Sequence, residues 1–235
     1  MPIAPSDALQ ALVPKRRAAL ERFLEHLTEQ FGAQLLAVEL VGPALDDPES
    51  TRIPDTVAVF AGDDLGKLRQ FARLGRGLAR EGVNAPLVLT PDLISTSLDT
   101  FPLEFIDMQA RHRLIHGQDF LSHLQFNPAD VRLQCERELK TAAMAMRQRT
   151  LHDPARSSWP AADIAEHTVR VLRGYLHLHR FPAGTTTREI VSVAARQLGL
   201  GLQAVLAAHA GAASWDDFQG LFRDLTALGT AANAW

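Results

Sequence analysis

Cysteine is almost absent from this chain of 235 residues, and its scarcity limits the chemistry that the chain can carry. Cys135 is the only cysteine. No disulfide can form within one chain, and no zinc site can be built from cysteine pairs. We therefore expect a protein of a reducing compartment.

Long hydrophobic runs are also missing. No stretch approaches the roughly 18 to 20 consecutive apolar residues that a membrane-spanning helix needs. The first residues, MPIAPSDALQALVPKRR, lack the apolar segment and the small-residue cleavage site of a secretory signal. We expect a cytoplasmic protein with no membrane partner.

The chain has no strong excess of charge of either sign, and its formal net charge is −3. Residues 1–125 carry 12 basic and 17 acidic side chains, and the remaining residues carry 12 and 10. A dedicated nucleic-acid-binding surface has a marked basic excess, so we do not expect a nucleic acid as partner. The motifs GxSxG, Walker A and GxGxxG after a strand are absent as well.

The hydrophobic pattern predicts two domains. In residues 1–126, helical spacing over 20–31 and 64–81 alternates with aliphatic, strand-like segments at 35–42, 56–61, 85–90 and 101–108. From residue 127 to 235 the apolar spacing is helical throughout. The pattern predicts an α+β protein, with a mixed sheet and its helices in residues 1–126 and an all-helical bundle in residues 127–235.

Three segments of the first domain carry a resemblance to a known family. They are Val41-Gly42-Pro43 after the first predicted strand, Pro54-Asp55-Thr56-Val57 at the start of the second, and the run LEFID at 103–107. In their order they resemble the minimal nucleotidyltransferase-like family, which has the kanamycin-nucleotidyltransferase fold. The resemblance implies a Gly-Ser turn for nucleotide phosphates and three carboxylates that hold Mg²⁺.

The catalytic signature that this resemblance implies is incomplete. Gly42 matches the glycine, but Pro43 replaces the serine and removes both a hydroxyl and an N–H donor. Asp55 matches the first metal ligand, Val57 stands at the second, and Glu104 takes the third position if LEFID is the late strand. At most two carboxylates remain, so a normal two-metal site is impaired.

A second resemblance lies in residues 98–140, which carry FPLEFID, GQD and VRLQCERELK. This segment resembles an uncharacterised bacterial branch of the nucleotidyltransferase-like proteins, in which a helix rich in basic residues and histidine follows the FPLEFID run. That branch has a degenerate active-site signature itself. The resemblance therefore implies a fold and gives no substrate.

These observations leave three functional hypotheses. The first is a noncatalytic or weakly active nucleotidyltransferase-fold protein that binds a nucleotide or a protein partner. The second is an active transferase that moves a nucleoside monophosphate to a small molecule or protein, with Mg²⁺ and an NTP bound through Asp55 and Glu104, or through a displaced acid of the segment 46–49. The third makes the bundle an interaction module, with homo-oligomers as one arrangement, or a HEPN-like ribonuclease through the R-x4-H pair Arg147 and His152.

Overall fold

The computed structural model describes residues 7–45, 53–62, 64–73, 75–152, 161–212 and 214–235. Their contacts form two compact units, one of residues up to 98 together with 108–125, and one of residues 99–107 together with 126–235. The protein is α+β with a four-stranded mixed sheet, as the sequence predicts. In the described part of the chain, no helix is both long enough and apolar enough to cross a bilayer.

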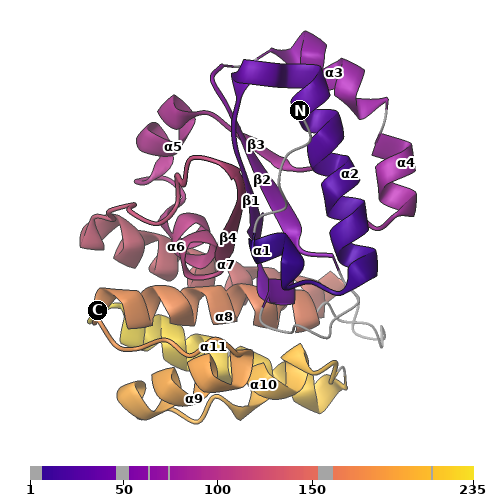
Figure 1. Cartoon of the computed structure of the whole chain (residues 1–235). Coiled ribbons are helices and arrows are strands. Elements are labelled where there is room, and N and C mark those ends of the chain that lie inside the picture. The colour runs from indigo at the N-terminus through magenta and orange to yellow at the C-terminus, as the bar shows by residue number, and fades with distance from the viewer. Residues whose placement is uncertain (1–6, 46–52, 63, 74, 153–160, 213) are drawn as a thin grey trace. The chain divides into compact units, whose positions relative to one another are not determined.

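The first unit is built on a sheet with the strand order β3-β2-β1-β4. β1 (Leu35–Val41) pairs antiparallel with β2 (Asp55–Phe60) and with β4 (His112–Gly117), and β2 pairs parallel with β3 (Leu87–Leu89). Helices lie on both faces of this sheet (Figure 1). The helices and short 3-10 turns of this part are α1 (Asp7–Gln10), α2 (Pro14–Phe31), η1 (Gly32–Gln34), η2 (Pro43–Leu45), α3 (Leu65–Ala72), α4 (Gly75–Arg80) and α5 (Pro91–Ser97).

The alternation of side chains along β1 decides which groups face which layer. Val38 and Leu40 belong to the same hydrophobic core as the apolar stripe of α2, which contains Leu20, Phe23 and Leu27. Successive strand residues point to opposite faces. Glu39, between Val38 and Leu40, therefore projects to the face of the sheet away from α2.

The prediction of a fourth strand at 101–108 is wrong. This segment is a helix, α6 (Pro102–Ala110). Pro102 begins the helix, where its fixed φ and missing N–H fit, and Glu104 stands in the first turn. Leu103 and Ile106 are three residues apart and are both buried in the core of the second unit, a spacing that favours a helix over a strand.

The true fourth strand is β4, in a segment that the sequence resemblance implied to be helical. Ile115 is its one buried residue, because β4 is an edge strand with several polar side chains. Its pairing with β1 shifts register between Val38 and Glu39. Gly117 ends the strand at φ +77°, where a Cβ would lie 1.8 Å from the carbonyl oxygen of Leu36. Only glycine fits this close approach.

The single helix predicted over 64–81 is two helices, α3 and α4. Asp64 caps α3 by accepting a hydrogen bond from the N–H of Lys67 at 3.0 Å. Gly75 and Gly77, which have low helix propensity, lie in α4.

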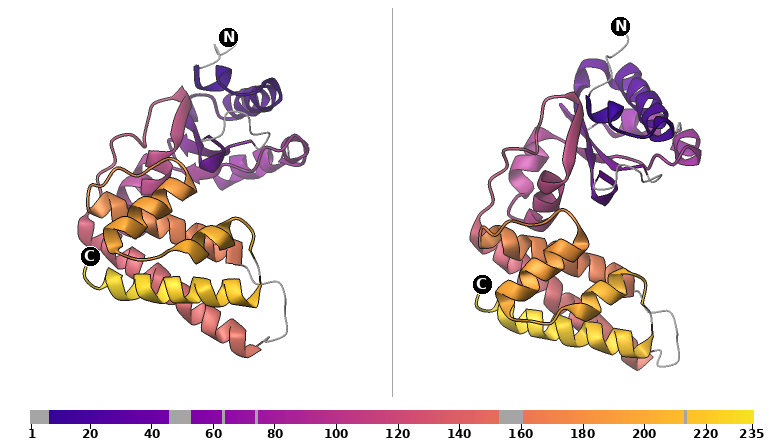
Figure 2. Two further views of the ribbon diagram at one scale, coloured as in Figure 1. Left: turned by 90° about the horizontal axis from the view of Figure 1, so that it is seen from below. Right: turned by 60° about the horizontal axis from the view of Figure 1, so that its bottom comes forward.

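The second unit contains a bundle of long helices, as predicted, which pack side by side in Figure 2. Thr186 with Glu189 and Ser214 with Asp217 form capping boxes at the starts of α9 and α11. Gly174 lets α8 approach its neighbours, because a Cβ there would lie 2.3 Å from Leu103 and 3.0 Å from Cys135. The helices are α7 (Pro128–His152), α8 (Ala161–Leu178), α9 (Thr187–Leu198), α10 (Gln203–His209) and α11 (Trp215–Ala232).

Candidate functional site

Two places in the first unit carry groups with chemistry, and the turn after β1 is the first. Gly42 adopts φ +90°, and a Cβ on it would lie 3.8 Å from Oδ2 of Asp55. Asp55 is the first residue of β2, and its Oδ1 accepts a hydrogen bond from Nδ2 of Asn84 at 3.0 Å. The structure thus brings together two of the sequence-predicted residues, with Oδ2 of Asp55 on the side of the turn.

The turn itself is fixed by its backbone and by two arginines. The N–H of Gly42 donates to the carbonyl of Arg111 at 3.0 Å, and Pro43 begins η2 and has no N–H to offer. The buried Arg16 donates to the carbonyl of Ala44 at 2.9 Å, and Arg113 donates to that of Leu45 at 3.4 Å. Two guanidinium groups therefore place positive charge at the turn, although its own backbone offers few donors.

Val57 and Glu104, the other two positions of the predicted signature, differ in their surroundings. Val57 is fully buried in the middle of β2, where it offers no oxygen to a cation. Glu104 lies on α6 and is held within the second unit: Gln134 donates to its Oε2 at 2.7 Å, and Arg170 lies 3.3 Å from its Oε1. The partners of Glu104 are thus an amide and an arginine. The acidic segment 46–49 lies outside the described residues.

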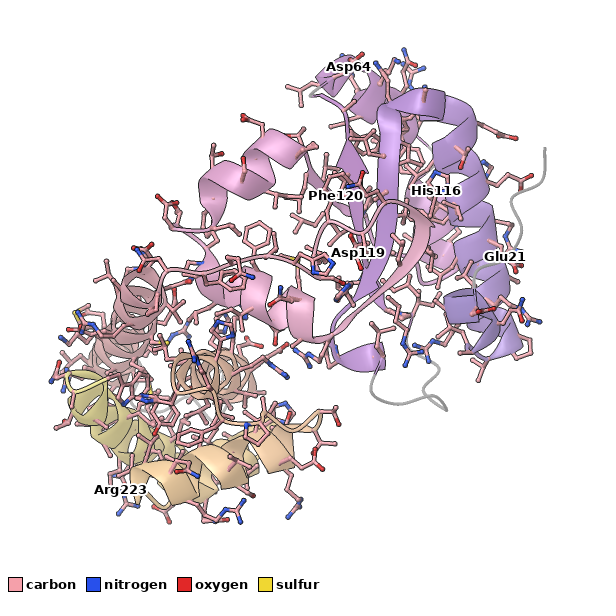
Figure 3. The ribbon with its side chains drawn as sticks, turned by 60° about the vertical axis from the view of Figure 1, so that its left-hand side comes forward. Glu21, Asp64, His116, Asp119, Phe120 and Arg223 are labelled. Atoms are coloured by element: carbon pink, nitrogen blue, oxygen red, sulfur yellow. The ribbon has the colours of Figure 1, made fainter. Side chains whose placement is uncertain are left out.

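The second place is a cluster of Glu39, His112 and Asp119, which sequence analysis missed. Within the described ranges it is the one group of three potential metal-ligating side chains, and its ligand atoms all lie within 4.8 Å of one another. Nε2 of His112 lies 3.4 Å from Oδ2 of Asp119 and 3.9 Å from Oε2 of Glu39. We call these residues the Glu-His-Asp cluster. Figure 3 shows Asp119 and Phe120 on the segment that follows β4, beside the sheet.

Backbone groups hold one atom of each side chain in this cluster. The N–H of Phe120 donates to Oε1 of Glu39 at 3.1 Å. The N–H groups of Leu121 and Ser122 donate to Oδ1 of Asp119 at 3.0 and 2.9 Å. Nδ1 of His112 lies 2.9 Å from the carbonyl oxygen of Gln109. The second atom of each side chain, Oε2, Oδ2 or Nε2, is the one that faces the cluster.

The loop that carries Asp119 is anchored from the end of α6. Nε2 of Gln109 donates to the carbonyls of Leu121, Ser122 and Leu124 at 2.9, 3.3 and 3.2 Å. The hydroxyl of Ser122 donates to Oδ2 of Asp119 and lies 3.2 Å from Nε2 of His112. Gln109 therefore positions both the loop, through its side chain, and His112, through its carbonyl.

The two carboxyl groups of the cluster have opposite electrostatic environments. Burial raises the pKa of Glu39 above its ordinary value of 4.5, against the N–H of Phe120 and the charge of His112, which lower it. Burial also acts to raise the pKa of Asp119, but hydrogen bonds from Ser122, Leu121 and His112 outweigh it and bring the pKa to about 2. Asp119 is thus an anion at neutral pH, while Glu39 gives up its proton less readily.

The ribonuclease hypothesis rests on Arg147 and His152 in the second unit. The guanidinium carbon of Arg147 lies 5.1 Å from the ring centre of Phe222, and Arg147 lines a cavity of about 530 Å³ together with Trp215 and Phe218. The side chain of His152 lies outside the described residues. Of this pair, the structure thus describes the side chain of Arg147, which is stacked on the ring of Phe222.

One signal in the sequence could have pointed to the Glu-His-Asp cluster. Glu39 is the single charged residue in the run LLAVELV, and a charge in a buried strand needs a partner or a site. His112 and Asp119 carry no comparable signal alone, because their meeting depends on β4 being a strand. Comparison of this chain with protein-family models and with curated proteins finds no match.

Proposed function

We propose that this protein binds a nucleotide at the turn between β1 and β2 and does not transfer it, as a nucleotidyltransferase-like protein with an incomplete metal site. The observation that carries the proposal is that Asp55 lies close to Gly42, at a turn whose carbonyl oxygens accept hydrogen bonds from Arg16 and Arg113. Positive charge beside a carboxylate suits a nucleotide phosphate that arrives with Mg²⁺.

The residues at this turn fit one cation better than two. Oδ2 of Asp55 can take one position on a Mg²⁺ ion whose other ligands are phosphate oxygens and water. A two-metal arrangement needs further carboxylates, but Val57 is buried and apolar, and Glu104 has Gln134 and Arg170 as partners. A Mg²⁺ ion held there would neutralise phosphate charge, and the half-buried Arg113 would orient the phosphates.

Isothermal titration of the full chain with each NTP, with and without Mg²⁺, tests the binding. We expect Mg²⁺-dependent binding that Asp55→Asn weakens at least about tenfold, as for loss of one metal ligand. Asp92→Asn, an exposed acid in the first turn of α5, is the matched control and should bind like the wild type. A chain that binds no NTP would overturn the nucleotide proposal and leave a protein partner as the ligand of this fold.

A transfer assay with α-labelled NTPs tests the second half of the proposal. We expect no label on added small molecules or on protein. Label transfer that Asp55→Asn abolishes would establish the alternative, an active Mg²⁺-dependent nucleotidyltransferase.

The buried single cysteine, whose thiol pKa is raised by burial to about 12, suits the cytoplasmic compartment that we propose.

A further inference from the structure

We propose that Glu39, His112 and Asp119 bind one divalent first-row transition metal ion of the Zn²⁺ type. This site goes beyond the proposed nucleotide binding, because none of its three side chains belongs to the Gly42–Asp55 turn. Three elements supply the ligands: β1 supplies Glu39, β4 supplies His112, and the loop after β4 supplies Asp119.

The strongest evidence is the buried oxygen of Glu39 that accepts no hydrogen bond. The side chain of Glu39 is fully buried, and its Oε2 has no hydrogen-bond partner. A buried carboxylate oxygen without a donor costs free energy, and structures rarely tolerate one without a compensating ion or water. Oε2 is directed toward Nε2 of His112, 3.9 Å away. A cation between these two atoms removes that cost.

The hydrogen bonds of His112 also indicate a cation at the cluster. A carbonyl only accepts hydrogen bonds, so Nδ1 of His112, which faces the carbonyl of Gln109, carries a hydrogen. Nε2 is then the ring nitrogen that faces Oδ2 of Asp119, its hydrogen-bond partner at 3.4 Å, and Oε2 of Glu39. Two carboxylate oxygens around one ring nitrogen call for a positive charge among them, and a bound metal ion takes the place of the proton that Nε2 shares with Asp119. A metal-ligating histidine usually binds the metal through one ring nitrogen and donates the N–H of the other to a carbonyl or carboxylate oxygen.

The pairing of β1 with β4 decides which histidine of β4 belongs to this cluster. Its register shift falls between Val38 and Glu39, so that Glu39 pairs with Leu114 while Val38 pairs with His116. As a result, His116 shares the face of Val38 toward α2, and His112, opposite Val41, shares the face of Glu39. One strand thus presents one histidine to each face of the sheet, and only His112 belongs to the cluster.

The ligand set selects the class of metal. Imidazole nitrogen with two carboxylates suits Zn²⁺ and its first-row neighbours, whereas Mg²⁺ and Ca²⁺ prefer oxygen ligands alone. Tetrahedral Zn²⁺ with bonds of about 2.1 Å places its ligand atoms roughly 3.4 Å apart. The pair of His112 and Asp119 stands at 3.4 Å and the pair of His112 and Glu39 at 3.9 Å, so the side chain of Glu39 needs only a small rotation.

The exposure of the three side chains indicates an open coordination position. The side chain of Glu39 is 0% exposed and that of His112 is 12% exposed, but that of Asp119 is 34% exposed. Three protein ligands leave a fourth position on a tetrahedral ion, and here it faces the solvent side at Asp119. Water completes the coordination, as in open zinc sites.

Metal titration of the full chain, stripped with a chelator beforehand, tests the proposal. We expect one equivalent of Zn²⁺ to bind with a dissociation constant below about 10 µM, and Co²⁺ to give d–d absorption bands of a low-coordinate site. His112→Gln and Asp119→Asn should each weaken binding at least about tenfold. Asn at 119 retains an oxygen for the N–H groups of Leu121 and Ser122, so the variant can keep the loop.

The matched control is His116→Gln, which removes the histidine on the other face of β4 and should leave Zn²⁺ affinity and the Co²⁺ spectrum unchanged. Circular dichroism confirms that each variant is folded. Zn²⁺ binding that is equal in the wild type, His112→Gln and Asp119→Asn would overturn the proposal and make the cluster a protonated histidine between two acids. So would the absence of binding. Asp55→Asn should keep full Zn²⁺ binding, which separates this test from that of the nucleotide site.

Discussion

Oε2 of Glu39 lies 3.9 Å from Nε2 of His112 and has no hydrogen-bond donor, in a side chain that is fully buried. The other oxygen of the same carboxylate accepts from the N–H of Phe120. Half of the carboxylate is therefore held by the backbone, and the other half faces an imidazole that is too distant for a hydrogen bond. Without a cation, this arrangement stores an electrostatic cost.

Glu39→Gln should relieve that cost. Glutamine keeps an oxygen for the N–H of Phe120 and has no charge, so we expect its free energy of unfolding at pH 7 in the presence of a chelator to rise by on the order of 1 kcal/mol. Chemical denaturation measures it. Added Zn²⁺ should reverse the order of the two proteins, because only the wild type gains the ion's binding energy. A variant less stable than the wild type without metal would contradict this account.

Gly117→Ala should unfold the edge of the sheet. The residue has φ +77°, and the new Cβ would meet the carbonyl oxygen of Leu36 at 1.8 Å. We expect a loss of about 3 kcal/mol or more in stability, together with weaker Zn²⁺ binding, because Asp119 follows two residues later. Gly199→Ala is the control: its φ is +66°, but no atom lies within 4 Å, so it should cost only about 1 kcal/mol.

Val57→Asp should not restore a catalytic signature. Val57 is fully buried and pairs across the strands with Glu39, so a new carboxylate would be desolvated beside an existing one. We expect a loss of about 3 to 5 kcal/mol in stability, as for other unpaired buried charges, and no nucleotidyl transfer. Val57→Thr, of similar volume, serves as the control and should cost less. A stable aspartate variant that transfers label would show that only this one acid was missing.

The parts of the fold that follow from local pattern could be predicted from the sequence. The apolar stripe of α2 has helical spacing, β1 and β2 are nearly continuous apolar runs, and both capping boxes of the bundle stand in the sequence. The segment of α6 could not be assigned in this way, because Leu103, Phe105 and Ile106 suit a strand as well as a helix over so short a run. Its burial against the second unit's core decides the matter.

The Glu-His-Asp cluster could not be predicted from the sequence for a related reason. Its residues stand at 39, 112 and 119, and they meet only because β4 pairs beside β1. An edge strand with a single buried residue has too little hydrophobic alternation to be predicted. For the turn, by contrast, the antiparallel pairing of β1 and β2 brings Gly42 near Asp55, because Gly42 directly follows Val41, the strand partner of Asp55.

Glu104→Gln separates the structural from the metal-binding role of this acid. Arg170 and Glu104 are 30% and 36% exposed in their side chains, and partly exposed ion pairs contribute only about 0.2 to 1 kcal/mol. We expect a stability loss in that range by chemical denaturation, with NTP binding unchanged in the presence of Mg²⁺. Binding that falls as far as in Asp55→Asn would assign Glu104 to the cation after all.

His116 should make the protein sensitive to mild acid. Burial lowers the pKa of this histidine below its ordinary value of 6.5, and in Figure 3 it lies toward α2. Above pH 6.5 it is neutral in both folded and unfolded chains. As the pH falls below 6.5 the unfolded chain binds the proton first, so stability is lost, by at most about 1.4 kcal/mol per pH unit for one proton.

Chemical denaturation at pH 7.5 and 5.5 tests this. The free energy of unfolding should fall less between these two pH values for His116→Gln than for the wild type. His167→Gln, an exposed position on α8, should behave as the wild type does, and an acid loss that is equal in all three proteins would contradict the burial of His116 as its cause.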